Sequence, residues 1–212
     1  MTEAGIRYEA SEINETRKEG IYLKLKLTFN SPAVLGFVTL CFCALMVNQA
    51  TGGAANRLLF MTYRSSWQDP LTYVRLVTHV FGHSGWEHFI GNMMYILLVG
   101  PLLEEKYGSP AIVKLITVTA VVTGLINALL FSNIALYGAS GVCFAFILLS
   151  SLTRFREGEI PITFILAAAI YFGQQFYEGL FVKDNVSNLG HVLGGIIGSM
   201  FGLFFTRRRR RR

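Results

Sequence analysis

Apolar residues gather into six stretches along the chain, and polar segments separate them. The stretches cover residues 32–50, 86–103, 110–131, 138–153, 160–177 and 187–206. A helix that crosses the hydrocarbon core of a bilayer needs about 20 mainly apolar residues, within a range near 17–25. The pattern therefore predicts an all-α polytopic membrane protein with six transmembrane helices, of which the fourth, 138–153, is short.

The polar segments define the domain organisation. Residues 1–30 are polar and charged, unlike a cleaved signal peptide, and predict a short cytoplasmic tail. Residues 31–206 are expected to form the six-helix membrane domain, and residues 207–212 a basic cytoplasmic tail. The connection 51–85 is too long to lack structure of its own. We expect it to lie partly embedded in the outer leaflet, since its aromatic residues suit the headgroup region; the alternative is an ordinary loop outside the membrane.

Charge is scarce and unevenly placed. Only 15% of the residues are charged, whereas soluble domains have roughly a quarter. Most Lys and Arg residues flank the predicted inner ends of the helices, so by the positive-inside rule we expect both termini in the cytoplasm. We expect the membrane to be the plasma membrane. The net charge of +6 could suggest nucleic acid, but this distribution argues against it. The six arginines 207–212 are expected to anchor on the anionic leaflet, the alternative being a solvated tail.

Polar side chains recur near the outer ends of the second, fourth and sixth predicted helices, which all run from outside to inside. They are His88 and Asn92, then Ser140, then His191. At 1.5 Å per residue, each lies within about 10 Å of the start of its helix. Polar groups are costly in hydrocarbon and usually face a bundle interior or a wet cavity. We therefore expect these four residues to converge at one depth.

A stripe of glycines follows the sixth stretch. Glycine recurs every four residues, at positions 190, 194, 198 and 202. Small residues at this spacing allow the backbone of a neighbouring helix to approach closely. A close crossing of the fourth and sixth helices would bring Ser140 to His191. The alternative is a set of packing glycines with incidental polar neighbours.

The converging residues suit acyl transfer. A serine hydroxyl is a poor nucleophile until a base takes its proton, and the unperturbed histidine pKa of about 6.5 suits that task near neutral pH. Ser140 would be the nucleophile and His191 the base. The resulting oxyanion needs preorganised donors, for which His88, Asn92 and the backbone N–H of Ser140 are candidates. Two further glycines, Gly138 and Gly141, would leave the main chain uncrowded beside the scissile bond.

No Asp or Glu lies at the expected depth of His191, so a catalytic dyad is predicted rather than a triad. Phe144 lies one turn after Ser140 on the same helix face, and its ring could stack on His191 and orient it. The short fourth helix would leave Ser140 open to water from the outer side. A helical substrate must unwind to be cut, which favours single-span proteins with helix-weakening residues near their outer ends.

Cysteines and the remaining histidines give no indication of a metal site or a cofactor. Cys41, Cys43 and Cys143 lack zinc-ligand spacing, and we interpret all three as small apolar fillers of helices. His79 and His83 are four residues apart and could share a metal on a helix. No Cys or carboxylate is placed to complete such a site, so structural hydrogen bonding beneath the first loop is the favoured interpretation.

Three motifs, taken together, resemble the rhomboid intramembrane serine proteases of the basic six-span prokaryotic type. They span residues 70–204: Arg75 with His79-x3-His83-x4-His88-x3-Asn92, then Gly138-Ala139-Ser140-Gly141 with Phe144, then His191-x2-Gly194-x3-Gly198. The resemblance implies a six-helix rhomboid-like bundle, the same dyad and the same oxyanion donors. It also implies a structural role for the segment from Glu104 to Gly108-Ser109. The family often has Trp-Arg where this chain has Val74-Arg75.

The expected activity is therefore intramembrane serine endopeptidase, with single-span membrane proteins as substrates, the lipid bilayer as its environment and no cofactor. One alternative is a catalytically inactive rhomboid-like factor that binds membrane clients; such relatives usually lack the serine or the histidine. Another is a small transporter or channel, which would usually carry carboxylates within the membrane. The physiological substrate and the oligomeric state are left open by the sequence.

Overall fold

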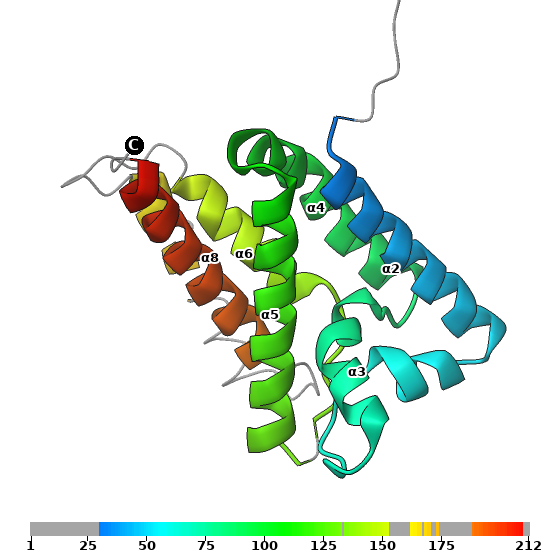
Figure 1. Cartoon of the computed structure of the whole chain (residues 1–212). Helices are drawn as coiled ribbons and strands as arrows, with labels where there is room; N and C mark the ends of the chain where they lie inside the picture. The colour runs from blue at the N-terminus through cyan, green and yellow to red at the C-terminus, as the bar shows by residue number, and fades with distance from the viewer. Residues whose placement is uncertain are drawn as a thin grey trace, which may run out of the picture.

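Figure 1 shows a computed structural model in which most of the described residues are helical. The structure describes residues 30–132, 134–152, 162–166, 168–170, 173 and 188–209. Its long helices are α2 (Pro32–Ala50), α4 (Trp86–Tyr107), α5 (Ser109–Leu130), α6 (Ser140–Ser151) and α8 (Asn188–Arg209). Between α2 and α4 lie η1 (Asn56–Phe60), α3 (Pro70–Thr78) and η2 (His79–Phe81). Within these ranges the only β-type pairing is an isolated antiparallel bridge between Thr62 and Leu136.

Helix bounds follow the predicted apolar stretches to within four residues: α4 extends to Tyr107 and α8 to Arg209, beyond the predicted ends at 103 and 206, while the fourth helix is shorter than predicted at both ends. The helix there begins at Ser140, and Gly138 and Ala139 precede it. Two helices, Pro32–Ala50 and Ser109–Leu130, are long and apolar enough to cross a bilayer, while Ser140–Ser151 and the segment Gly190–Phe204 are shorter apolar helices. The stretch 160–177 is described only in part, and residues 1–29 and 210–212 lie outside the described residues. The fold is helical as expected, and the count of six crossings stays a prediction.

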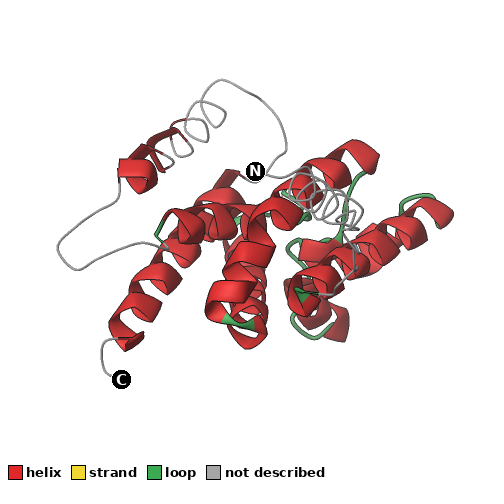
Figure 2. Cartoon of the chain, turned by 90° about the horizontal axis from the view of Figure 1, so that it is seen from above, coloured by secondary structure: helices red, strands yellow, loops and turns green. Residues whose placement is uncertain are grey.

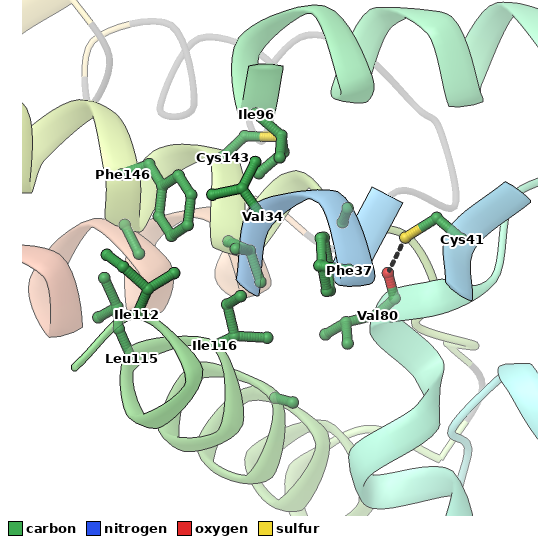
Figure 3. Close-up of a cluster of buried hydrophobic side chains, with 14 of the residues drawn as sticks. Val34, Phe37, Cys41, Val80, Ile96, Ile112, Leu115, Ile116, Cys143 and Phe146 are labelled. Atoms are coloured by element: carbon green, nitrogen blue, oxygen red, sulfur yellow. Dashed lines mark hydrogen bonds between the residues drawn. The ribbon is translucent and has the colours of Figure 1, made fainter. Parts of the chain in front are cut away.

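Helix α5 is central to the bundle. It contacts α2, α3, α4, α6 and α8, while α2 and α8 lie on opposite sides of it (Figure 1). Figure 2, seen from above, shows the same helical arrangement without a sheet in the described part of the chain. The core between these helices is a cluster of buried apolar side chains (Figure 3), among them Val34, Phe37, Ile96, Ile112, Leu115, Ile116, Cys143 and Phe146.

A single carboxyl group joins the first and second long helices to the turn before the third. Glu104 is only 4% exposed. Its two oxygens accept hydrogen bonds from the backbone N–H groups of Ala33 and Val34, each at 2.9 Å, and from the hydroxyl of Ser109 at 2.7 Å. The first N–H groups of a helix have no partner within it. Glu104 therefore supplies, from α4, the N-terminal cap that α2 lacks locally.

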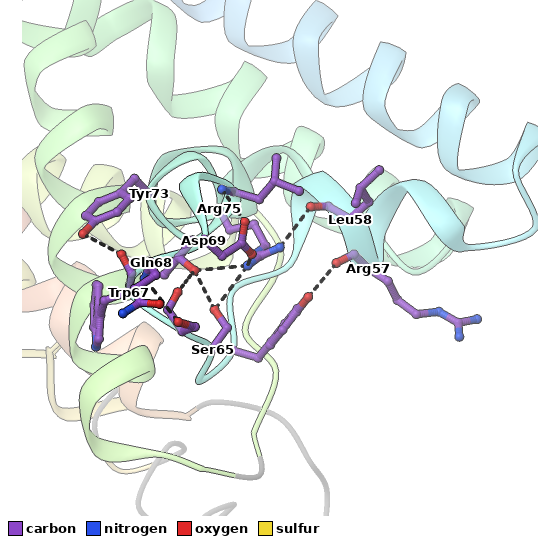
Figure 4. A network of polar contacts seen from close by, with 12 residues as sticks. Arg57, Leu58, Ser65, Trp67, Gln68, Asp69, Tyr73 and Arg75 are labelled. Carbon is purple, nitrogen blue, oxygen red and sulfur yellow. Dashed lines mark hydrogen bonds and ion pairs between the residues drawn. The ribbon is translucent and has the colours of Figure 1, made fainter.

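The connection between α2 and α4 is organised by a buried arginine (Figure 4). Arg75 is 3% exposed, and its guanidinium pairs with Asp69 at 2.8 Å and also bonds Ser65 and the carbonyl of Leu58. It lies over the ring of Tyr63 at 4.8 Å. Hydrogen bonding from Arg75 holds the pKa of the Asp69 carboxyl below its usual value. The loop thus folds around an internal charge, and its embedding in the outer leaflet stays a prediction.

Replacing Glu104 with Ala should destabilise the fold. The change removes three hydrogen bonds and leaves the N-terminus of α2 without its cap, so we expect a loss of roughly 2–4 kcal/mol of unfolding free energy. Thermal unfolding of the purified protein in detergent measures it. Glu105→Ala is the matched control, because Glu105 is exposed on the same helix. Equal melting temperatures for the two variants would contradict the capping role.

Candidate active site

The central contact of the site joins the first residue of α6 to the first turn of α8. His191 Nε2 lies 2.7 Å from Ser140 Oγ. Both residues are partly buried. If the imidazole proton sits on Nδ1, the serine hydroxyl donates to Nε2, which is the arrangement in which a histidine can take that proton. The two residues are 51 positions apart in the chain, so only the packing of α6 against α8 can bring them together.

That packing is a backbone contact through glycine. Among the described elements, α6 and α8 share the most extensive interface, and Figure 1 shows them side by side. A Cβ on Gly194 would clash with the carbonyl oxygen of Gly141, and one on Gly198 with that of Ala145. One more turn along, a Cβ on Gly202 would come within 2.9 Å of the Leu152 side chain. Gly194 and Gly198, one turn apart on α8, thus hold its distance from α6 near the minimum that two backbones allow, and Gly202 leaves room for the Leu152 side chain.

His88 and Asn92 approach the same place from α4. A Cβ on Gly138 would lie 2.8 Å from His88 Nε2 and 3.9 Å from Asn92 Nδ2. Gly138 has φ +119°, a conformation that strongly favours glycine. This position therefore needs glycine twice over, for its backbone and for the space that the two side chains occupy. The His88 imidazole and the Asn92 carboxamide thus both lie close to Gly138, which is two residues before Ser140 in the chain.

The Asn92 carboxamide is one of several buried polar groups in the described residues that have an atom without a hydrogen-bond partner. Its Nδ2 is buried and has no hydrogen-bond partner within the described part of the chain, although Asn92 is only 7% exposed. Buried polar atoms are rarely left without a partner, and each exception calls for an explanation. Nearby, the backbone N–H of Cys143 makes a helical bond to Ala139 O, so the N–H groups of Ser140 and Gly141 precede the first such bond of α6. Donors thus collect around Ser140.

Phe144 lies where the sequence suggested. Its ring centroid is 5.0 Å from that of His191, with the ring planes tilted by 49°. Ring pairs at this separation attract each other in tilted geometry. The aromatic ring therefore packs against the imidazole on the side of α6.

His79 and His83 contact protein groups instead of converging on a common point. His79 Nε2 lies 3.0 Å from the carbonyl oxygen of Ala120, and His83 Nδ1 lies 3.0 Å from that of Phe81. Burial lowers the pKa of each to about 4, so both are neutral at neutral pH. His83 also packs edge-on to His88, with ring centroids 5.0 Å apart. In the described ranges no three His, Cys, Asp or Glu residues come together as metal ligands would.

Two supporting contacts have no counterpart in the sequence interpretation. The segment before α6 is joined to the first loop by the bridge of Thr62 with Leu136, whose two hydrogen bonds are 2.9 and 2.8 Å long. Asn127 fixes the same pair of segments by donating to the carbonyls of Thr62 and Ile134. The second contact joins Cys143 to Asn92. In the sequence, the one indication of the contact between the first loop and the segment before α6 is Asn127, a polar residue near the end of an apolar stretch.

Comparison with known proteins decides the family. The family model described as "Rhomboid domain" matches residues 70–208. This chain belongs to the rhomboid family. It is 26% identical over 196 residues to rhomboid protease GlpG of Serratia proteamaculans (strain 568), which covers 89% of this chain and 68% of the relative. It is 29% identical over 189 residues to rhomboid protease GlpG of Yersinia pestis (strain Pestoides F), covering 88% and 67%.

A third relative, rhomboid protease GlpG of Yersinia pseudotuberculosis serotype O:3 (strain YPIII), gives the same identity and coverage. The resemblance inferred from the three motifs is thereby confirmed. By class, this rhomboid-family chain is a serine-type intramembrane endopeptidase. The roles of its individual residues stay predictions.

Gly194→Ala should abolish most proteolysis while leaving a helical protein. The added methyl group meets the Gly141 carbonyl and forces α8 away from α6, which separates Ser140 from His191. A displacement of about 1 Å can cost roughly a hundredfold in rate, and we expect a loss of that order in kcat/KM. Gly91→Ala is the control, since a Cβ there meets nothing within 4 Å. Comparable kcat/KM in Gly194→Ala and Gly91→Ala would show that activity does not depend on the close approach of α8 to α6 at Gly194.

Proposed function

We propose that the chain cleaves the transmembrane segments of single-span membrane proteins near their outer ends, with Ser140 as nucleophile and His191 as general base. The observation that carries the proposal is the 2.7 Å contact between Ser140 Oγ and His191 Nε2. His191 removes the hydroxyl proton as Ser140 attacks the scissile carbonyl, and then returns that proton to the leaving amine. Water then attacks the acyl-enzyme carbonyl while His191 takes a proton from it, and His191 returns that proton to Ser140 Oγ as the ester bond breaks and the carboxyl product leaves.

In this mechanism the oxyanion is stabilised by His88, Asn92 and the backbone N–H of Ser140. Support comes from the convergence of His88 Nε2 and Asn92 Nδ2 on Gly138 and from the unpartnered state of the amide nitrogen. The N-terminus of α6 adds the positive end of its dipole. The donors are held before substrate arrives, so no reorganisation is needed when charge develops. Gly138 and Gly141 keep the main chain open beside the scissile bond.

Phe144 orients the imidazole in place of a carboxylate. Its support is the 5.0 Å ring contact with His191. A stacked ring restricts rotation of the imidazole without adding charge. The proposed site is therefore a dyad with an apolar support, and no metal or cofactor takes part in it.

The proposed setting is a plasma membrane with six crossings formed by residues 31–206, and with the flanking segments 1–30 and 207–212 in the cytoplasm. Helix α6 has 12 residues, which span only about 18 Å of a hydrocarbon core near 30 Å thick. Ser140, at the first residue of that short helix, can then lie below the outer surface and still receive water from the outer side. Substrates reach this depth as helices and must unwind there, because a helical amide is shielded.

Removing either dyad member should abolish cleavage. Ser140→Ala eliminates the nucleophile and His191→Ala its base, so we expect losses of at least three orders of magnitude, on the scale of other serine dyads and triads. Purified protein in liposomes is assayed against a panel of single-span substrates, with fluorophosphonate labelling of Ser140 as a second readout. Full activity in Ser140→Ala would end the proposal. Wild-type protein that neither cleaves nor labels would favour the inactive client-binding alternative.

Removing one proposed oxyanion donor should lower kcat less than removing a dyad member, and should leave KM nearly unchanged. Asn92→Ala and His88→Ala each remove one donor, which is worth about 10²–10³ in kcat. KM should change little, because the contact strengthens mainly in the transition state. Steady-state kinetics of each variant against the same substrate measure the split. An increase in KM at unchanged kcat would assign these residues to substrate binding instead.

A further inference from the structure

Cys143 was interpreted from the sequence as an apolar filler, but its surroundings are polar on one side. The residue is 2% exposed and lies on α6, three positions after Ser140. Its Sγ is 3.5 Å from Asn92 Oδ1 and 3.5 Å from the Asn92 carbonyl oxygen. The rest of its environment is the apolar cluster drawn in Figure 3. The thiol is therefore a donor that faces two oxygens of one residue.

The two ends of the Asn92 carboxamide face different surroundings. Oδ1 points to the Cys143 thiol, while Nδ2 points toward Gly138 and has no partner among the described residues. Turning the amide by 180° would place a lone pair where the proposed oxyanion forms, and would replace a donor–acceptor contact with Sγ by a weaker N–H to sulfur contact. The observed orientation is the one in which the thiol proton has an oxygen to bond and the N–H₂ group faces the site.

We infer that Cys143 is a positioning residue that orients the Asn92 carboxamide, so that its N–H₂ group is aimed at the developing oxyanion. The inference rests on the proposed function, because it assigns a support to one of its donors. Cys143 touches neither substrate nor the reacting atoms. It links the helix that carries the nucleophile to the helix that carries the donor, and so makes the position of Asn92 depend on that of Ser140.

Four substitutions test the role. Cys143→Ala and Cys143→Val remove the thiol with a smaller and a larger side chain, and Cys143→Ser keeps a donor. Cys41→Val is the matched control, since Cys41 is also a buried thiol, 3.8 Å from the carbonyl oxygen of Val80. Full-length protein in liposomes is assayed with a single-span fluorogenic substrate for kcat and KM, and its melting temperature is recorded for each variant.

We expect Ala and Val at position 143 to lower kcat by about three- to tenfold, the effect of one weak hydrogen bond, with KM within about twofold of wild type. Cys143→Ser should retain kcat within about twofold, and Cys41→Val should match wild type. In an Asn92→Ala background, Cys143→Ala should have no further effect on kcat, because the group it orients is gone. If Cys143 only fills space, Cys143→Ala should lower kcat by the same factor in the wild-type and Asn92→Ala backgrounds. The loss of kcat should then parallel the loss of melting temperature among the variants.

The outcomes separate this inference from the proposal beneath it. If the wild-type protein does not cleave the substrate, or if Ser140→Ala keeps full activity, the proposed function is overturned. If Ser140→Ala and His191→Ala abolish cleavage but Cys143→Ala and Cys143→Val leave kcat unchanged, only the positioning role is overturned. An equal loss of kcat in Cys143→Ser and Cys143→Ala also overturns it, since a donor would then make no difference.

Discussion

The backbone contact between α6 and α8 is the constraint on which the site depends. Gly194 lies against Gly141 and Gly198 against Ala145, with no side chain between the two main chains. In a lipid environment the hydrophobic effect does not drive helices together, so close packing of small residues carries much of the association. The Ser140–His191 distance is then set by how near two backbones can come, and both residues lie within a turn of that contact.

Around this contact, the interior polar groups are largely paired with one another across elements. Glu104 caps α2, Arg75 holds the first loop, and Asn127 ties that loop to the segment before α6. Unpaired polar groups are expensive in a low-dielectric interior. Some atoms of the interior polar groups still lack a partner among the described residues, such as Arg75 Nε, Asn127 Oδ1 and Asn92 Nδ2. The nitrogen of Asn92 differs from the other two in its position, because it lies beside Gly138, two residues before Ser140. A site that must bind charge only during reaction has a reason to leave a donor unsatisfied at rest.

How far the sequence predicts this structure depends on the range of each interaction. Apolar stretches located the long helices, because the length of an apolar run is a local property. The four-residue glycine spacing predicted the α6–α8 approach, since a stripe on one helix is visible without its partner. The depth argument grouped His88, Asn92, Ser140 and His191, and the structure brings them around Gly138 and the start of α6. The family resemblance was confirmed by comparison.

Contacts between distant segments were less accessible to prediction. Nothing local links Thr62 to Leu136, or shows that the thiol of Cys143 faces Asn92 rather than apolar neighbours. The start of α6 at Ser140 was also missed by two residues, because Gly138 takes a positive φ that hydrophobicity does not reveal. In each case the deciding partner is more than 40 residues away or is a backbone angle. Pattern analysis therefore located the long helices and grouped the candidate site residues, but it did not reveal the contacts of Thr62 with Leu136 or of Cys143 with Asn92.

The cap on α2 has a consequence for how the chain is made. Glu104 lies 70 positions after the N–H group of Val34 that it binds, and Ser109 follows five residues later. As the polypeptide emerges from the ribosome, α2 is complete well before its cap exists. The first helix can enter the membrane early but acquires its final end-contact only after α4 and the turn to α5 have been synthesised. The contact that fixes the start of α2 against α4 can therefore form only after residue 104 has been synthesised.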